Sequence, residues 1–317
     1  MSENELHIQS GAVSLCASLC LPDGVAHPAV VLMVHGSGPL DRNENAKGIR
    51  LEVFSQIAAY LSEQGIASLR YDKRGCGKST GVYLEAGHHD LVSDANACIE
   101  LLKQCGDVDH RRIYVLGHSE GSIIAPQLSA LQPGLAGIIL LTPFIQNLKD
   151  VLITQAHTVT QSIQELKGIK GIIARFLIRF TLFNPVKQQP ILLERLQDND
   201  EPVIRFMLNK VAARWLREMM QLDPPGIFRR VTCPVLIIAG EKDVQCDPND
   251  VAEIKKVLTV PCESHVVENL THILRYDDDR PSIFNYRKLS KRPVESEVLT
   301  TIGCWLLNQT RITTGSL

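Results

Sequence analysis

Gly117-His118-Ser119-Glu120-Gly121 is the stretch that decides the fold of this 317-residue chain. A short apolar run at 113–116 precedes it and a segment of helical character follows it, so a strand, a tight turn and a helix are expected to meet at Ser119. The glycines on either side of the turn leave room for the strand and the helix to approach each other. The stretch therefore has the pattern of a nucleophile elbow, a strained turn that lifts a serine hydroxyl clear of the backbone.

Working outward from the elbow, apolar runs alternate with segments in which apolar residues recur at helical spacing. Strand-like runs occupy 29–34, 66–71, 113–116, 135–141 and 235–239, and helical spacing occurs at 51–61 and 90–102. This alternation predicts a mostly parallel sheet with helices on both faces. An earlier run at 13–21 ends in the turn signal Pro22-Asp23-Gly24 and is expected to be an antiparallel strand. Asp247-Pro248 is expected to cap and begin a later helix.

The alternation stops between 143 and 230, where helical patterns follow one another and we identify no strand. We therefore expect an α/β core made of 1–142 and 231–317, with a helical cap inserted at 143–230. Within the cap, 169–183 mixes basic and apolar residues. This pattern suits a membrane-surface helix or, as we favour, a cap helix whose apolar face covers a pocket.

Composition excludes several classes of protein. Charged residues make up 21% of the chain and the formal net charge is −2, so the chain has no net positive electrostatic field that would attract nucleic acid. The first five residues are acidic and lead into no apolar stretch, which predicts a cytoplasmic protein without stable membrane insertion. Nine cysteines without a Cys-x-x-Cys pair indicate reduced thiols and no metal site, and Cys16 and Cys20 are expected as small apolar residues on one strand face.

Three loops that follow predicted strands supply the groups that a serine nucleophile needs. His35-Gly36-Ser37-Gly38-Pro39 is positioned to donate the backbone N–H of Ser37, beside that of Glu120, to an oxyanion. Asp243 and His272 follow two later strands, so serine, acid and histidine occur in the order Ser119, Asp243, His272. In this arrangement the serine attacks, the histidine carries its proton and the carboxylate orients the histidine.

Rival groups suit other roles. Asp247 and Asp250 are alternative acids, but both fit better at a helix N-terminus. His118 adjoins the serine in the elbow and is expected to point away from it.

With these motifs the chain resembles the α/β-hydrolase superfamily, specifically the bacterial esterase-like group related to prolyl-oligopeptidase-type hydrolases. The residues that carry the resemblance are 35–43, 70–81, 117–121, 240–243 and 269–272. It implies an eight-stranded, mostly parallel sheet with a helical cap. It also implies hydrolysis of a carboxylic ester through an acyl-enzyme on Ser119, with no cofactor. Many relatives have a second glycine where this chain has Ser122.

The expected partner is a small-molecule ester. Apolar cap residues, Phe144 among them, are expected to bind a short-to-medium acyl chain together with Leu40 from the 35–43 loop. Thioester and amide hydrolysis share the acyl-enzyme route, so a thioesterase and a serine peptidase remain alternatives on the same triad. The sequence leaves the oligomeric state open.

A nucleotide hydrolase is the remote alternative, because Gly75-Cys76-Gly77-Lys78-Ser79-Thr80 ends like a phosphate-binding P-loop. The first glycine of that motif should stand at position 72, which is Asp72, and Gly81 follows where a helix should begin. We expect Asp72 and Arg74 to belong instead to a buried or half-buried polar network. An inactive binding protein on the same fold is disfavoured because all three triad residue types occur in order.

Overall fold

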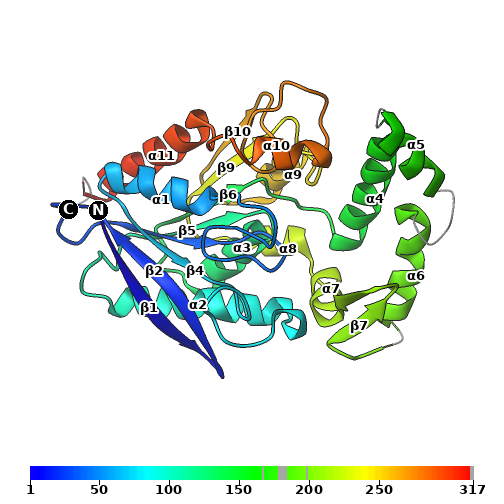
Figure 1. Cartoon of the computed structure of the whole chain (residues 1–317). Helices are drawn as coiled ribbons and strands as arrows, with labels where there is room; N and C mark the ends of the chain where they lie inside the picture. Colours follow the sequence, from blue (N-terminus) through cyan, green and yellow to red (C-terminus); the bar gives the residue numbers. More distant parts are fainter. Residues whose placement is uncertain (166–167, 178–183, 198, 315–317) are drawn as a thin grey trace.

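The computed structural model describes residues 1–165, 168–177, 184–197 and 199–314 (Figure 1). Eight strands form one sheet in the order β1-β2-β4-β3-β5-β6-β9-β10. The strands are β1 (Ser2–Ser10), β2 (Val13–Leu21), β3 (Val30–Val34), β4 (Ala67–Tyr71), β5 (Ile113–His118), β6 (Gly137–Leu141), β9 (Val235–Gly240) and β10 (Cys262–Val267). β1 and β2 are antiparallel to their neighbours, and the other six strands are parallel. The mostly parallel eight-stranded sheet is therefore confirmed.

β1 has no counterpart among the predicted strands. It pairs with β2 alone, and most of its residues are exposed, so its sequence carries few apolar residues to signal a strand.

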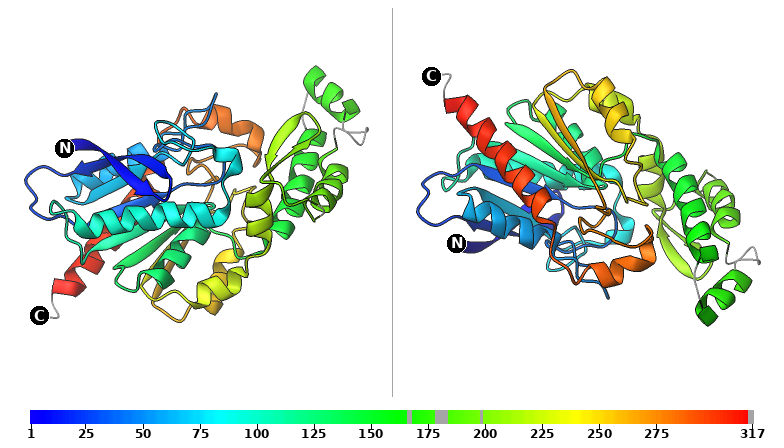
Figure 2. Two further views of the ribbon diagram at one scale, coloured as in Figure 1. Left: turned by 90° about the horizontal axis from the view of Figure 1, so that it is seen from below. Right: turned by 90° about the horizontal axis from the view of Figure 1, so that it is seen from above.

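Helices cover both faces of the sheet (Figure 2). One layer contains α1 (Val53–Glu63) and α11 (Ser296–Thr314), and the other contains α2 (His88–Gln104), α3 (Gly121–Leu131), α8 (Pro224–Arg229) and α9 (Asp250–Val257). In β3 the side chains of Val30 and Leu32 join the core on the α2 side, whereas Val31 and Met33 join the core on the α1 side. Both faces of a parallel strand are thus buried, which is why these strands are continuous apolar runs.

Most of the chain between β6 and β9, from 148 to 220, forms a separate group of elements beside the sheet (Figure 1), whereas α8 packs on the sheet. The elements of this group are α4 (Leu148–Glu165), α5 (Gly168–Leu177), α6 (Pro185–Gln197), β7 (Val203–Phe206), β8 (Asn209–Ala212) and α7 (Ala213–Met220). The antiparallel β7–β8 hairpin corrects the prediction that this segment is wholly helical. Its strands have four residues each, too few for a period-two pattern to stand out.

α5 also departs from expectation. Ile172, Ile173 and Phe176 are more than half exposed, so these apolar side chains are not packed into the core as the prediction of a covering face would suggest. Residues 178–183 of the predicted amphipathic stretch lie outside the described ranges. Across the described ranges, no helix combines the length and apolar character that a bilayer crossing requires.

The predicted helix start at Asp247-Pro248 is wrong, because α9 begins at Asp250. The Asp247 carboxylate accepts the N–H of Asn249 at 2.9 Å and closes a turn ahead of the helix. An Asp-Pro pair serves turns as well as helix starts, and the sequence does not distinguish them. The remaining short elements are η1 (Tyr83–Glu85), η3 (Ile283–Asn285) and α10 (Tyr286–Leu289).

Candidate active site

Ser119 stands in the turn between β5 and α3 with a φ of 52°, in the left-handed region that non-glycine residues seldom adopt. A Cβ at Gly117 would lie 2.0 Å from the Gly121 carbonyl oxygen, and a Cβ at Gly121 would lie 2.1 Å from that of Val34. Both glycines are therefore required by the crowding that the motif predicts. The Ser122 hydroxyl donates to the Ser119 carbonyl at 2.6 Å and helps to fix the start of α3.

The loops after β9 and β10 bring Asp243 and His272 together. His272 Nδ1 lies 2.8 Å from Asp243 Oδ2, and both side chains are buried. The other carboxylate oxygen accepts the backbone N–H groups of Gln245 at 2.8 Å and Cys246 at 3.0 Å. The carboxylate is thus held from both sides with one oxygen facing the imidazole.

The two rival acids have other partners. Asp250 is buried and accepts the Ile145 N–H at 3.1 Å, while burial raises the pKa of its carboxyl group. Asp247 is exposed and bonds within its own turn.

Ser119 and His272 line one cavity of about 160 Å³. The remaining lining residues are Gly36, Ser37, Leu40, Glu44, Leu51, His118, Gln245, Ile273 and Tyr286. Ser37 and Leu40 therefore lie where the sequence analysis placed them, beside the serine. Phe144 does not line this cavity, because its side chain is buried in the core on the α2 side of the sheet.

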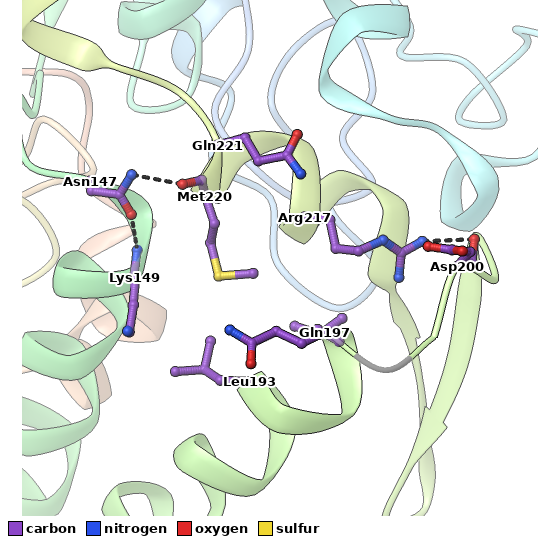
Figure 3. Close-up of a pocket in the computed structure, with 9 residues that line it drawn as sticks. Asn147, Lys149, Leu193, Gln197, Asp200, Arg217, Met220 and Gln221 are labelled. Carbon is purple, nitrogen blue, oxygen red and sulfur yellow. Dashed lines mark hydrogen bonds between the residues drawn. The ribbon is translucent and has the colours of Figure 1, made fainter.

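A larger cavity of about 450 Å³ lies among α4, α6 and α7 (Figure 3). Met220 extends across it toward Leu193, and Arg217 is bound to backbone carbonyls that include that of Asp200 at 2.9 Å. Ser119, Asp243 and His272 are not among its lining residues. The arrangement of these three side chains, and not cavity size, makes the smaller cavity the candidate site.

Glu44 is a site residue that the sequence analysis missed. Its Oε2 lies 2.8 Å from His118 Nδ1, and its Oε1 accepts the Gly36 N–H at 2.8 Å. The other ring nitrogen of His118 lies 2.9 Å from the backbone carbonyl oxygen of His272. A carboxylate and a carbonyl oxygen face the two ring nitrogens, an arrangement that favours the doubly protonated imidazolium form of His118. No spacing motif marks Glu44, since the contact spans 74 residues.

The pKa shifts of this pair agree with that assignment. Burial by itself lowers the pKa of His118, but the Glu44 carboxylate raises it above its ordinary value on balance. Burial likewise raises the pKa of Glu44, and the charge of His118 and its hydrogen bond bring it below its ordinary value.

The Gly-Lys-Ser stretch does not form a P-loop. The Asp72 carboxylate accepts the Lys78 N–H at 2.9 Å and pairs with Arg42 at 2.8 Å, so it occupies the centre of the loop. Arg74 pairs with Asp94 at 2.6 Å. Asp72 and Arg74 both have polar partners as predicted, but in two separate pairs and not in one network. No helix begins directly after Thr80.

A serine in a left-handed elbow after β5, with an acid after β9 and a histidine after β10, defines an α/β-hydrolase. The chain belongs to the serine aminopeptidase S33 family, which matches residues 27–279.

Two comparisons with curated proteins extend this result. Esterase EstD of Thermotoga maritima is 27% identical over 295 residues, which cover 92% of this chain and 65% of that protein. An uncharacterised Mycobacterium tuberculosis protein is 34% identical over 109 residues, covering 34% of this chain and 37% of its own length. This chain thus spans less than two thirds of the length of either relative.

Solved structures share the fold. Est1E from Butyrivibrio proteoclasticus with bound ferulic acid has a TM-score of 0.64 at 19% identity, covering 96% of this chain and 99% of that one. Proline iminopeptidase from Mycobacterium smegmatis has a TM-score of 0.63 at 18% identity, covering 98% and 100%.

Proposed function

We propose that this chain is a carboxylesterase-type serine hydrolase that cleaves small-molecule esters with short acyl groups through an acyl-enzyme on Ser119. The observation that carries the proposal is the His272 Nδ1 to Asp243 Oδ2 contact of 2.8 Å beside a cavity that Ser119 also lines. A hydroxyl is a weak nucleophile at neutral pH and needs a base oriented in this way.

The reaction follows from these groups. His272 Nε2 takes the Ser119 hydroxyl proton as Oγ attacks the ester carbonyl, and the backbone N–H groups of Ser37 and Glu120 receive the oxyanion. Glu120 stands at the N-cap position of α3, where the helix dipole also favours negative charge. The tetrahedral intermediate expels the alcohol, which takes the proton from His272. Water, activated by the same histidine, then releases the acid and restores the serine.

The cavity favours a short acyl group. Its volume of about 160 Å³ is well below the roughly 300–1,000 Å³ of sites for larger ligands. Leu40, Leu51 and Ile273 offer it apolar walls, and each methylene buried there contributes about 0.8 kcal/mol until the space is full. We therefore propose acyl chains at the short end of the short-to-medium length range that the sequence analysis expects.

We further propose that 143–230 acts as a cap on a core of 1–142 and 231–317. Two hydrogen bonds from the proposed cap to residues of the core support this role. Gln155 of α4 donates to the backbone carbonyl of Gln245 at 3.0 Å, and Gln245 lines the cavity. Trp215 of α7 donates to the Glu120 carboxylate.

A peptidase on the same triad is the second candidate, since the family is named for aminopeptidases. An aminopeptidase must hold the α-ammonium group of its substrate, and a carboxylate is the natural partner. Glu44 is the acidic side chain among the described residues that line the cavity, and its two oxygens are engaged by His118 and Gly36. The ester assignment is therefore favoured.

Two measurements test the proposal. A fluorophosphonate probe should label the protein, and Ser119→Ala should abolish the label. A panel of p-nitrophenyl esters beside amino-acid p-nitroanilides should show turnover of the esters. A labelled protein that cleaves the anilides efficiently and the esters poorly would establish the peptidase instead.

A further inference from the structure

Lys73, in the loop after β4, contacts both halves of the proposed oxyanion hole. Its Nζ lies 2.6 Å from the Gly36 carbonyl oxygen and 2.8 Å from Glu120 Oε2. The Gly36 carbonyl belongs to the same peptide group as the Ser37 N–H, and Glu120 carries the second donor. One ammonium group therefore binds the oxygen of the peptide group that carries the Ser37 N–H and the side chain of Glu120, which carries the second N–H.

This ion pair is buried, with each side chain 2% exposed. Burial lowers the pKa of Lys73, but the Glu120 carboxylate raises it on balance, so the amine stays charged. A buried ion pair is costly to desolvate, and apolar residues of similar volume often serve stability as well or better. Stability is thus a weak reason for a charged pair at this place.

A third side chain completes the arrangement. The indole N–H of Trp215, from α7 of the proposed cap, donates to Glu120 Oε1 while Lys73 binds Oε2. The carboxylate is held from the core on one side and from the cap on the other. Its position fixes the ammonium group, which in turn holds the Gly36 carbonyl.

A cation on a peptide oxygen also changes the peptide group. Hydrogen bonds polarise one another along a chain, so an amide whose oxygen binds an ammonium group is a stronger N–H donor. The Ser37 N–H lies on that amide, and Ser37 lines the same cavity as Ser119.

Building on the proposed esterase function, we propose that Lys73 is a positioning residue, held by Glu120 and Trp215, that orients and polarises the Gly36–Ser37 peptide for oxyanion binding. Lys73 is not among the residues that line the Ser119 cavity, so we expect it to act through the Gly36–Ser37 peptide and not on the substrate. Its effect should appear in the transition state, where the oxyanion exists, and not in ground-state binding.

The variant for the test is Lys73→Met/Glu120→Gln, which removes both charges together and keeps an acceptor for Trp215. Replacing one partner alone would leave a buried charge unpaired. We expect kcat on p-nitrophenyl acetate to fall about 10- to 100-fold, less than the loss of a whole oxyanion donor costs, with KM changed less than about 3-fold. The inhibition constant of a methyl trifluoromethyl ketone, whose adduct with Ser119 carries an oxyanion, should rise by the same factor.

The matched control is Arg74→Met/Asp94→Asn. Arg74 comes from the same loop as Lys73 and pairs at 2.6 Å with Asp94 of α2, and the pair contacts neither Gly36 nor Glu120. It should leave kcat and ketone inhibition within about 3-fold of wild type. Equal losses in the two double variants would show that Lys73 is merely structural.

Trp215→Phe keeps the proposal testable if the double variant does not fold, since it deletes one N–H and keeps a ring. It should lower kcat and ketone affinity together by about 3- to 10-fold, whereas unchanged ketone inhibition would overturn the proposal. Fluorophosphonate labelling of wild type distinguishes failure of this inference from failure of the proposed esterase function. A labelled, active wild type with unchanged kcat in Lys73→Met/Glu120→Gln overturns this inference alone, and an unlabelled, inactive wild type overturns both.

Discussion

His118 Nδ1 lies 2.8 Å from Glu44 Oε2, and the two groups form a buried ion pair next to the proposed catalytic histidine. The rings of His118 and His272 lie 5.2 Å apart, and His118 also binds the His272 backbone carbonyl. Glu44 in turn holds the Gly36 N–H. This pair therefore connects the proposed oxyanion loop to the loop of the general base, although neither side chain reacts.

The pair makes stability depend on pH in a defined window. The folded-state pKa of His118 is raised above 6.5, so its contribution is complete below that value and is lost as pH rises through the folded-state pKa. The folded-state pKa of Glu44 is lowered below 4.5. The contribution of Glu44 to stability is therefore present above pH 4.5 and is lost as pH falls through the folded-state pKa. Both contributions are present between 4.5 and 6.5.

Glu44→Gln/His118→Gln should therefore flatten the pH dependence of the melting temperature. We expect wild type to lose more stability than the variant between about pH 6 and pH 9, by about 1.4 kcal/mol for each unit by which the His118 pKa is raised. Melting curves across that range measure the difference. Parallel curves would show that His118 does not titrate with the raised pKa.

Ser119→Ala should leave the fold intact while removing nearly all esterase turnover. Loss of a triad nucleophile typically costs several orders of magnitude, and alanine fits the same turn. Activity on p-nitrophenyl acetate measures the loss of turnover, and a thermal melt checks that the variant is folded. A folded variant that keeps more than a few per cent of activity would exclude Ser119 as the nucleophile.

Asp243→Asn should slow turnover by about 10³- to 10⁴-fold, because an amide can present its NH₂ group to His272 Nδ1 and favour the wrong tautomer. Asp247→Asn is the matched control. It lies four residues away, is exposed and bonds only within a turn, so it should cost about 1 kcal/mol of unfolding free energy or less and little activity. Kinetics of both variants decide the assignment; greater damage from Asp247→Asn would transfer the role to that residue.

Catalytic efficiency should rise over the first few acyl carbons and then fall. The cavity of about 160 Å³ fills early, so additional methylenes find little further apolar wall to bury against. Leu40→Ala should shift the optimum toward longer chains, whereas Phe144→Ala should lower stability without moving it, since Phe144 is buried in the core. A flat chain-length profile, or an optimum moved by Phe144→Ala alone, would place the acyl group elsewhere.

The sequence predicts the central sheet and the positions of Ser119 and Asp243 because both follow strands that are apolar and buried along their whole length. The elbow glycines are predictable because a Cβ at Gly117 would lie only 2.0 Å from a backbone oxygen. The strand before His272 is mostly polar and partly exposed, so the order serine, acid, histidine is what points to that residue. Contacts between distant side chains carry no such signal. Glu44 and His118 are 74 residues apart, and Trp215 and Glu120 are 95 apart. The prediction for the cap missed two features. The β7–β8 hairpin is too short to show an alternating pattern, and the apolar residues of α5 are exposed although their spacing predicts a buried face.

The most direct test of the central claim is mass spectrometry of the intact protein, quenched within the first turnovers on p-nitrophenyl acetate. The account predicts a protein heavier by one acetyl group, with the acetyl on the peptide that contains Ser119, and no such species in Ser119→Ala. Ester turnover with no acetylated intermediate, or with the acetyl on another residue that Ser119→Ala leaves unchanged, would contradict it.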